Sequence, residues 1–210
     1  MSSIRLGVRL NLLLANAGLD ALDDKTVRKF DSYLSLFVRW NERISLSAAR
    51  DEESILSTHL VESIAVARQL PNEIATLLDF GSGGGLPGIP IALCRPAISV
   101  TLAESQGRKA AFLEEAVREL GISAKVYARR AESLGERFDC VILRAVDRMP
   151  KAVGEAATLV ARRGWLALMT TDLELAKLQR IAGAEFTWGA SFRLPRSNSK
   201  VLALGQKVNS

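Results

Sequence analysis

The spacing of apolar residues divides the chain into a helical first third and a longer part in which short strands and helices alternate. Residues 4–17 carry apolar side chains at every third or fourth position, which predicts an amphipathic helix that ends near Gly18. Asp23 or Asp24 can cap the next helix, and Pro71 is expected to end the one after it. The helices expected in this part are residues 4–17, 23–41 and 52–70.

The rest of the chain alternates between short apolar runs, typical of buried strands, and stretches with helical periodicity. Strands are expected over residues 76–79, 98–104, 123–128, 139–143 and 165–169, helices over 87–94, 110–120, 150–162 and 173–182, and two final β-segments over 186–194 and 200–204. Because this alternation requires a parallel sheet with right-handed crossovers, we predict an α/β fold that binds its ligand at the carboxyl ends of the strands. Residues 1–74 are then a helical extension packed on a core domain of residues 75–210.

The first predicted strand leads directly into five glycines that lie between Gly81 and Gly88. Without Cβ atoms, such residues allow positive φ angles and let backbone N–H groups approach a ligand. Asp79, at the end of the strand, can accept hydrogen bonds from the amides of this turn or from a ligand amine. A strand, a glycine-rich turn and a helix in this order indicate a site for a nucleotide-like ligand.

Two motifs fit this glycine-rich turn. The spacing Asp79-x-Gly81-x-Gly83-x-Gly85 resembles motif I of class I S-adenosylmethionine-dependent methyltransferases. The shifted frame Gly83-x-Gly85-x-x-Gly88 also satisfies the pattern of dinucleotide-binding proteins. The glycines alone therefore leave the ligand open between S-adenosylmethionine and NAD.

Glu104 ends the second predicted strand, 19 residues after Gly85, close to the ~20-residue spacing expected for a carboxylate that binds a ribose. Both S-adenosylmethionine and NAD contain that ribose. The terminal pair of β-segments is typical of the methyltransferase variant of the fold, whereas a plain dinucleotide-binding domain continues to alternate. The tail therefore favours S-adenosylmethionine.

Composition narrows the class of protein further. With 210 residues, 48% of them hydrophobic and 24% charged, the chain is long enough for one soluble domain and a small appendage. Cys94 and Cys140 lie in apolar runs and are expected to be buried thiols of a reducing compartment. A zinc site is not expected with His59 as the only histidine. We therefore expect a cytoplasmic protein without a metal or a membrane span.

The net charge of +5 is concentrated from residue 75 onward, which suits a polyanionic substrate such as a nucleic acid. His59 lies on an otherwise apolar predicted helix. A histidine in this setting is more typical of a hydrogen-bonded core or interface residue than of a catalyst. The residues therefore indicate a binding surface for an anion but no acid or base for the chemistry.

A series of short motifs extends over most of residues 10–170. In chain order they are Trp40-Asn41, Ile44-Ser45-Leu46-Ser47, His59-Leu60-Val61-Glu62-Ser63, Leu86-Pro87-Gly88-Ile89-Pro90, Thr101-Leu102-Ala103-Glu104-Ser105, Gly107-Arg108-Lys109, Arg130-Ala131-Glu132 and Arg144-Ala145. In this order they resemble the glucose-inhibited division protein B family of small-subunit ribosomal RNA guanine-N7 methyltransferases. The resemblance implies a Rossmann-like class I methyltransferase fold, with a seven-stranded, mostly parallel sheet and an antiparallel C-terminal hairpin.

The resemblance also implies S-adenosylmethionine as cofactor and roles for individual residues. Together with Asp79 and Gly83 of the glycine motif, the expected cofactor-binding residues are Gly81 and Leu86 beside the methionine portion, Glu104 on the ribose, Ala131 and Glu132 beside the adenine, and Arg144 after the fourth strand. The family more often has aspartate where this chain has Glu104. In the alternative interpretation, Glu132 is an ordinary exposed loop acid. Arg144 then has no contact with the cofactor and serves only to form an ion pair with Asp79 or Glu104.

The implied substrate is N7 of a guanosine in 16S ribosomal RNA, free or in an assembling small subunit, and the protein is expected to be a monomer. Because N7 is an unprotonated lone pair, methyl transfer needs no general base, and we nominate no catalytic residue. The candidate RNA-binding cations are Arg148, Arg193, Arg196 and Lys200.

One departure concerns Met169, which stands where the family usually has lysine. The alternatives left open are a methyltransferase of this fold that acts on another RNA or a small molecule, and a binding module or NAD-dependent protein.

Overall fold

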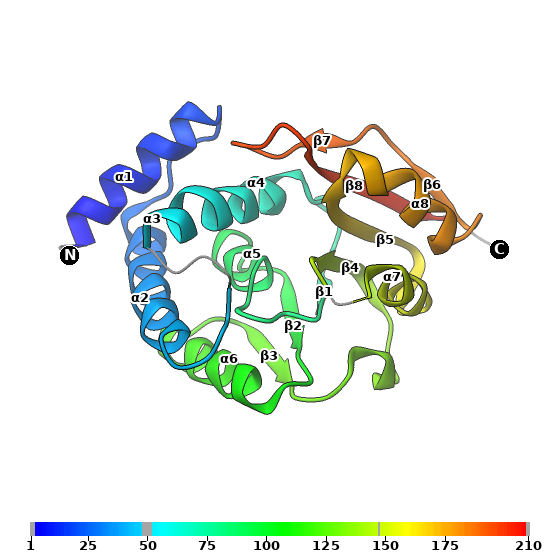
Figure 1. Ribbon diagram of the computed structural model, residues 1–210, viewed down its shortest axis with the longest axis horizontal. Coiled ribbons are helices and arrows are strands. Elements are labelled where there is room, and N and C mark those ends of the chain that lie inside the picture. Colours follow the sequence, from blue (N-terminus) through cyan, green and yellow to red (C-terminus); the bar gives the residue numbers. More distant parts are fainter. Residues whose placement is uncertain (1–2, 48–51, 147, 209–210) are drawn as a thin grey trace.

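The computed structural model describes residues 3–47, 52–146 and 148–208, and Figure 1 shows the arrangement of its elements. The helices are α1 (Ser3–Asn16), α2 (Asp24–Asn41), α3 (Glu52–Ser54), the π-helix η1 (Ile55–Leu60), α4 (Val61–Gln69), α5 (Gly88–Cys94), α6 (Gly107–Leu120), the 3₁₀-helix η2 (Ala131–Ser133), α7 (Met149–Thr158) and α8 (Asp172–Ala182). The strands are β1 (Thr76–Phe80), β2 (Ser99–Ala103), β3 (Ala124–Tyr127), β4 (Phe138–Arg144), β5 (Val160–Thr171), β6 (Phe186–Trp188), β7 (Phe192–Arg193) and β8 (Lys200–Lys207).

All these strands form one sheet in the order β3-β2-β1-β4-β5-β8-β6, and the two-residue β7 pairs additionally with β8. The first five strands of this order run parallel, whereas β8 is antiparallel to both β5 and β6. The sheet confirms the predicted α/β fold, with seven strands in its main order and an antiparallel C-terminal pair. It also brings the carboxyl ends of β1, β2 and β4 to one edge, where the crossovers leave room for a ligand.

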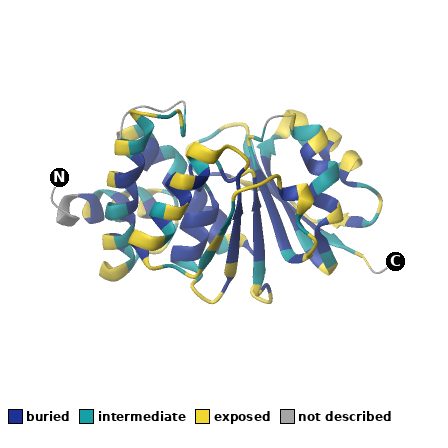
Figure 2. Cartoon of the chain, turned by 90° about the horizontal axis from the view of Figure 1, so that it is seen from below, coloured by how far each residue is buried: buried dark blue, intermediate teal, exposed yellow. Residues whose placement is uncertain are grey.

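Two hydrophobic cores cover the two faces of the sheet. Leu77 of β1 belongs to the core beneath α1, α2, α4, α5 and α6, and the next residue, Leu78, belongs to the core beneath α7 and α8. Figure 2 shows the buried strands between these two groups of helices. Because both faces are covered, the central strand β4 carries a continuous buried apolar run over residues 140–143. The N-terminal helices share their core with the sheet.

Local signals predicted most of the helix ends correctly. The Asp23 side chain accepts a hydrogen bond from the Thr26 N–H (2.9 Å) and caps α2. Gly121 ends α6 in the left-handed conformation, with φ +52°. Both signals are local to the helix end, which explains why a sequence pattern can predict them.

Three expected elements differ from the prediction. The helix expected over residues 150–162 ends at Thr158, and β5 begins at Val160, which pairs with Phe138 before the register shifts. The apolar spacing there fits a helix, but pairing with β4 prevails. The expected helix 52–70 contains the π-helical segment η1, and the expected β-segment 186–194 is divided into β6 and β7. Among the described residues, the helices lack the combination of length and apolar character that a membrane crossing requires.

Candidate active site

Positive φ angles and backbone hydrogen bonds together define the glycine-rich turn after β1. Gly81, Gly83 and Gly85 have φ angles of +77°, +55° and +80°. The N–H groups of Gly81 and Ser82 donate to the Ala103 carbonyl at 3.0 and 2.9 Å, which ties the turn to the end of β2. A Cβ on Gly85 would lie 2.5 Å from Ile89, so the turn also needs glycine for space.

Glu104, directly after β2, connects the two halves of this site. Its Oε2 accepts a hydrogen bond from the Gly83 N–H (3.0 Å), and its Oε1 accepts one from the Gln106 N–H (2.7 Å). A carboxylate has about four acceptor positions, so two remain for the hydroxyls of a ribose. The side chain is largely buried, at 7% exposed, yet it lines a cavity. The acid predicted from its distance to the glycines therefore lies directly beside them.

The cavity has a volume of about 800 Å³ and opens at the carboxyl ends of the strands. Seven of the eight predicted cofactor-binding residues line it: Gly81, Gly83, Leu86, Glu104, Ala131, Glu132 and Arg144. Its size is within the range of small-molecule sites, and its lining combines backbone N–H groups with one well-placed carboxylate. These are the groups that a nucleoside with a charged tail requires.

Asp79 is the eighth predicted residue, and it does not line this cavity. Its side chain is only 1% exposed, and its Oδ2 accepts a hydrogen bond from the Gly88 N–H (3.0 Å) at the start of α5. Of the two partners considered for Asp79, the structure therefore shows the amide of the turn. Burial raises the pKa of this carboxyl to about 7, although the hydrogen bond from Gly88 opposes the rise.

Helix α2 supports the glycine-rich turn from below. The Tyr33 hydroxyl donates to the Gly84 carbonyl (2.5 Å), and the ring of Phe37 lies so close that a Cβ on Gly84 would be 2.5 Å from it. Tyr33 and Phe37 are completely buried and meet edge to face, with ring centroids 5.9 Å apart. The N-terminal extension therefore forms the floor of the turn.

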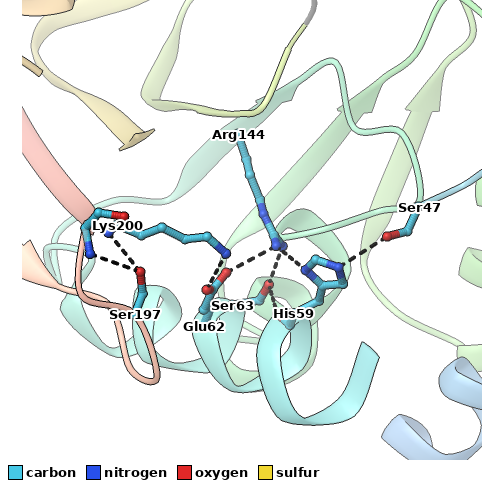
Figure 3. A network of polar contacts seen from close by, with 8 residues as sticks. Ser47, His59, Glu62, Ser63, Arg144, Ser197 and Lys200 are labelled. Atoms are coloured by element: carbon cyan, nitrogen blue, oxygen red, sulfur yellow. Dashed lines mark hydrogen bonds and ion pairs between the residues drawn. The ribbon is translucent and has the colours of Figure 1, made fainter. Parts of the chain in front are cut away.

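Arg144, at the end of β4, lies at the centre of a polar network on one wall of the cavity (Figure 3). Its Nη2 group is 3.2 Å from Oε2 of Glu62 and 2.5 Å from Nδ1 of His59. Nζ of Lys200 is 2.7 Å from the other oxygen of Glu62, and Nε2 of His59 is 3.2 Å from the hydroxyl of Ser47. The partner of Arg144 is thus Glu62, where the sequence had suggested Asp79 or Glu104.

A family model described as rRNA small subunit methyltransferase G (GidB) matches residues 26–186, most of the chain. The chain belongs to the rRNA small subunit methyltransferase G family. This family is the one that the motifs predicted. Its model covers α2 from Thr26 onward, the glycine-rich turn, Glu104 and Arg144, so the residues that line the cavity all lie within the match.

Curated members of the rRNA small subunit methyltransferase G family are similar over about three quarters of the chain. Ribosomal RNA small subunit methyltransferase G of Neisseria meningitidis is 37% identical over 163 residues, which is 77% of this chain and 78% of that protein. The proteins of the same name from Stenotrophomonas maltophilia and Xylella fastidiosa are 40% and 41% identical, over 74% and 72% of this chain and 73% of each relative.

Solved structures outside this family share its fold. Magnesium protoporphyrin IX methyltransferase from Synechocystis, solved with bound S-adenosylmethionine, superposes with a TM-score of 0.62 at 17% identity and covers 89% of this chain and 98% of its own. A didemethyltoxoflavin N1-methyltransferase from Burkholderia thailandensis, with bound S-adenosylhomocysteine, reaches 0.58 at 17% identity, over 85% and 90% of the two chains. These likenesses confirm the class I methyltransferase fold.

The four cations predicted to bind RNA do not share one environment. Arg148 lines the cavity, but Arg193 and Arg196 line a second hollow of about 400 Å³ beside the end of α1. Arg193 also forms an ion pair with Asp172 (2.5 Å), and Lys200 is bound to Glu62. Of the four, only Arg148 lines the cavity that holds the predicted cofactor-binding residues.

Other cavity-lining residues were not assigned to the site from the sequence. Four are cations, Lys109, Arg129, Arg130 and Lys151, which line the cavity together with Arg148. Glu62 does not line the cavity but contacts Arg144, which does. From the sequence it was given no role, although a carboxylate in a largely apolar stretch of helix is unusual and was the available signal. Met169, the departure from the family, is buried and pairs with Arg144 across β4 and β5.

Proposed function

We propose that the protein transfers the methyl group of S-adenosylmethionine to N7 of a guanosine in 16S ribosomal RNA. The observation that carries this proposal is the placement of Glu104 against the Gly83 amide, in one cavity, in a chain of the rRNA small subunit methyltransferase G family. In this proposal the protein is a cytoplasmic monomer without a metal. Its substrate is the RNA, either free or in an assembling small subunit.

In this proposal the residues of the cavity divide the cofactor between them. Glu104 accepts hydrogen bonds from the ribose hydroxyls at its two remaining acceptor positions. Gly81 and Leu86 adjoin the methionine portion, Ala131 and Glu132 adjoin the adenine, and Arg144 lies beside the cofactor on the wall of the same cavity. When bound, S-adenosylmethionine supplies an electrophilic methyl group on its sulfonium. Asp79 holds the turn in shape from beneath and makes no contact with the ligand.

Positioning is the main contribution of the chain to the reaction. Guanine N7 carries a lone pair and no proton, so the chain needs no group that removes one before the methyl group is transferred. Holding the two reactants in line lowers the barrier by saving the entropy of bringing them together. The cations around the cavity, Lys109, Arg129, Arg148 and Lys151, then hold the phosphates on either side of the target nucleotide.

Methylation of ribosomal RNA from cells that lack this protein tests the proposal. We expect the purified protein and labelled S-adenosylmethionine to modify 16S RNA or small subunits from such cells, and mass spectrometry of nuclease fragments to find 7-methylguanosine. Transfer of the label to an RNA other than 16S, or only to a small molecule, would instead support a methyltransferase with that other substrate. Binding of NAD in place of S-adenosylmethionine in calorimetry would overturn the proposal.

A further inference from the structure

Glu62 is a buried charge with an unusual pair of neighbours. Its side chain is 1% exposed, and its two oxygens contact Arg144 from β4 and Lys200 from β8. A buried ion pair adds little to stability, because removing the ions from water offsets most of their attraction. The arrangement is therefore better explained by what it does to the position of Arg144 than by stability.

His59 must be neutral and in one tautomer to fit its two neighbours. An arginine guanidinium only donates, so Nδ1 of His59 accepts from Arg144, and the ring proton is on Nε2, which donates to the Ser47 hydroxyl. Burial, together with the charges of Arg144 and Lys200, lowers the pKa of His59 to about 4. The ring therefore accepts from Arg144 throughout the neutral range.

These contacts hold the Arg144 guanidinium in place and use only part of its set of donors. Within the part of the chain that the structure describes, Nη2 donates to Glu62 and His59, and one Nη1 hydrogen donates to Ser63 (3.4 Å). The Nε–H and the second Nη1–H have no partner there. Arg144 also lines the cavity, and these N–H groups are the donors that it has left for a ligand there.

We propose that Glu62 and His59 are positioning residues that hold the Arg144 guanidinium against the target base. This inference rests on the proposed function. Guanine presents the acceptor O6 beside N7 on the same edge, so an arginine held there can donate to O6 and leave N7 free for the methyl group. The base gains a positive charge as its N7–CH₃ bond forms and the S–CH₃ bond breaks. Glu62 supplies the negative charge that moderates repulsion between Arg144 and the methylated base.

Lys200 connects this network to the C-terminal hairpin. It lies at the start of β8, its backbone N–H donates to the Ser197 hydroxyl (2.9 Å), and its ammonium contacts Glu62. Figure 3 shows how the hairpin, α4 and the end of β4 meet at this carboxylate. The position of the hairpin is thereby coupled to the position of Arg144.

Two substitutions of His59 separate the positioning role from a structural one. In His59→Asn the amide oxygen can occupy the position of Nδ1 and keep the bond to Arg144, whereas His59→Gln places its amide near Nε2 and keeps only the bond to Ser47. Each variant loses one hydrogen bond of the ring. We expect kcat for RNA methylation to fall at least 10-fold in His59→Gln and less than 3-fold in His59→Asn. Equal losses in the two variants would overturn the proposal.

Glu62→Gln removes the charge but keeps the shape of the side chain. We expect kcat to fall 10- to 100-fold while the cofactor Kd from calorimetry changes less than 3-fold, and Glu62→Asp to recover part of the rate. A cofactor Kd that weakens in parallel with kcat would assign Glu62 to the general structure of the cavity and overturn the positioning role.

NMR of the single histidine gives a readout that does not depend on RNA methylation. With ¹⁵N-labelled histidine, the native protein is expected to show the Nε2–H tautomer and no protonation between pH 8 and about pH 5. In Arg144→Met the tautomers should mix. An Nδ1–H tautomer in the native protein would overturn the proposal even if the RNA is methylated, and an inactive protein with the expected tautomer would instead contradict the proposed function.

Discussion

The carboxylate of Glu104 performs two tasks with one pair of oxygens. Each oxygen accepts one backbone N–H, from Gly83 and from Gln106, and each has an acceptor position left for a ligand. The longer side chain of glutamate, where the family more often has aspartate, still reaches both amides. Removal of this carboxylate therefore takes away a hydrogen-bond acceptor for the ligand and loosens the glycine-rich turn at the same time.

We expect Glu104→Ala to weaken cofactor binding by a factor of roughly 100, because hydrogen bonds to a charged group contribute about 1.5–3 kcal/mol. Gly83→Val should have a similar effect, since its φ of +55° strains any residue with a branched side chain. Isothermal calorimetry with S-adenosylmethionine measures both, and Glu114→Ala, on the exposed side of α6, is the control. Full affinity in the Glu104 and Gly83 variants would contradict the assignment of the cavity.

Asp79 makes stability depend on pH in the opposite direction from an ordinary carboxylate. Its pKa is about 7 in the folded protein and 3.8 in the unfolded chain, so folding favours the protonated form. The stability that this group contributes is complete below about pH 4 and is lost as the pH rises through 7. The loss is on the order of 4 kcal/mol, since one pKa unit corresponds to about 1.4 kcal/mol.

Asp79→Asn imitates the protonated acid and should remove this dependence. We expect the difference in unfolding free energy between the variant and the native protein to change by a few kcal/mol between pH 4.5 and pH 7.5, in favour of the variant at high pH. Urea titrations followed by circular dichroism measure it. His59 acts in the opposite sense between about pH 6.5 and 4, but it is present in both proteins and cancels in the difference. Parallel stability curves would show that Asp79 is ionised when folded.

At the scale of elements, α2 determines the shape of the glycine-rich turn. Tyr33 is buried and its hydroxyl reaches the Gly84 carbonyl, 51 residues further along the chain. At the other end of the helix, Arg39 and Trp40 both donate to Glu115 of α6, at 2.9 and 3.0 Å. Helix α2 therefore holds both the turn after β1 and the helix after β2.

Tyr33→Phe keeps the packing of the ring and leaves the Gly84 carbonyl without its donor. We expect a loss of about 1–3 kcal/mol in unfolding free energy, the penalty of a buried acceptor without a partner. Weaker binding of S-adenosylmethionine should accompany it. Thermal and urea unfolding measure the first effect, and calorimetry measures the second. Tyr127→Phe, which removes an exposed hydrogen bond to Ser133, is the matched control and should change stability less.

At the scale of the whole molecule, several cations from different elements line one cavity. The cavity is lined by cations that come from α6, the loop after β3 and α7, and the net charge of the chain is +5. Helices α1, α2 and α4 share a hydrophobic core with the sheet, and we propose that residues 1–74 form an extension of one folding unit. In the proposed function, these cations attract the RNA to the cavity.

The salt dependence of RNA binding tests the role of these cations. Each phosphate that the protein no longer neutralises should reduce the steepness of the plot of log K against log salt concentration by about 0.7–0.9. The double variant Arg129→Ala with Arg148→Ala should therefore reduce it by about 1.4–1.8. Filter binding to 16S RNA at several salt concentrations measures the slope. The control is Lys25→Ala with Arg28→Ala on the exposed face of α2. Equal slopes in the two double variants would place the RNA elsewhere.

Local patterns were sufficient to predict the alternation of elements, the caps of α2 and α6, and the glycine-rich turn followed by an acid. Each depends on contacts or preferences within a few neighbouring residues, which a sequence shows directly. The predicted end of α7 was wrong, because the pairing of Val160 with Phe138 overrides a helical pattern. A strand partner of this kind lies far enough along the chain that periodicity carries no information about it.

The polar network could not be predicted from the sequence. Glu62 and Arg144 are 82 residues apart, and Glu62 and Lys200 are 138 apart, so their meeting depends on the sheet order that places β8 beside β5. Asp79 shows the same limit, since its spacing from the glycines does not reveal whether its carboxylate faces the ligand or the turn. Residue chemistry specifies which contacts are favourable, but packing brings distant segments together and selects among those contacts.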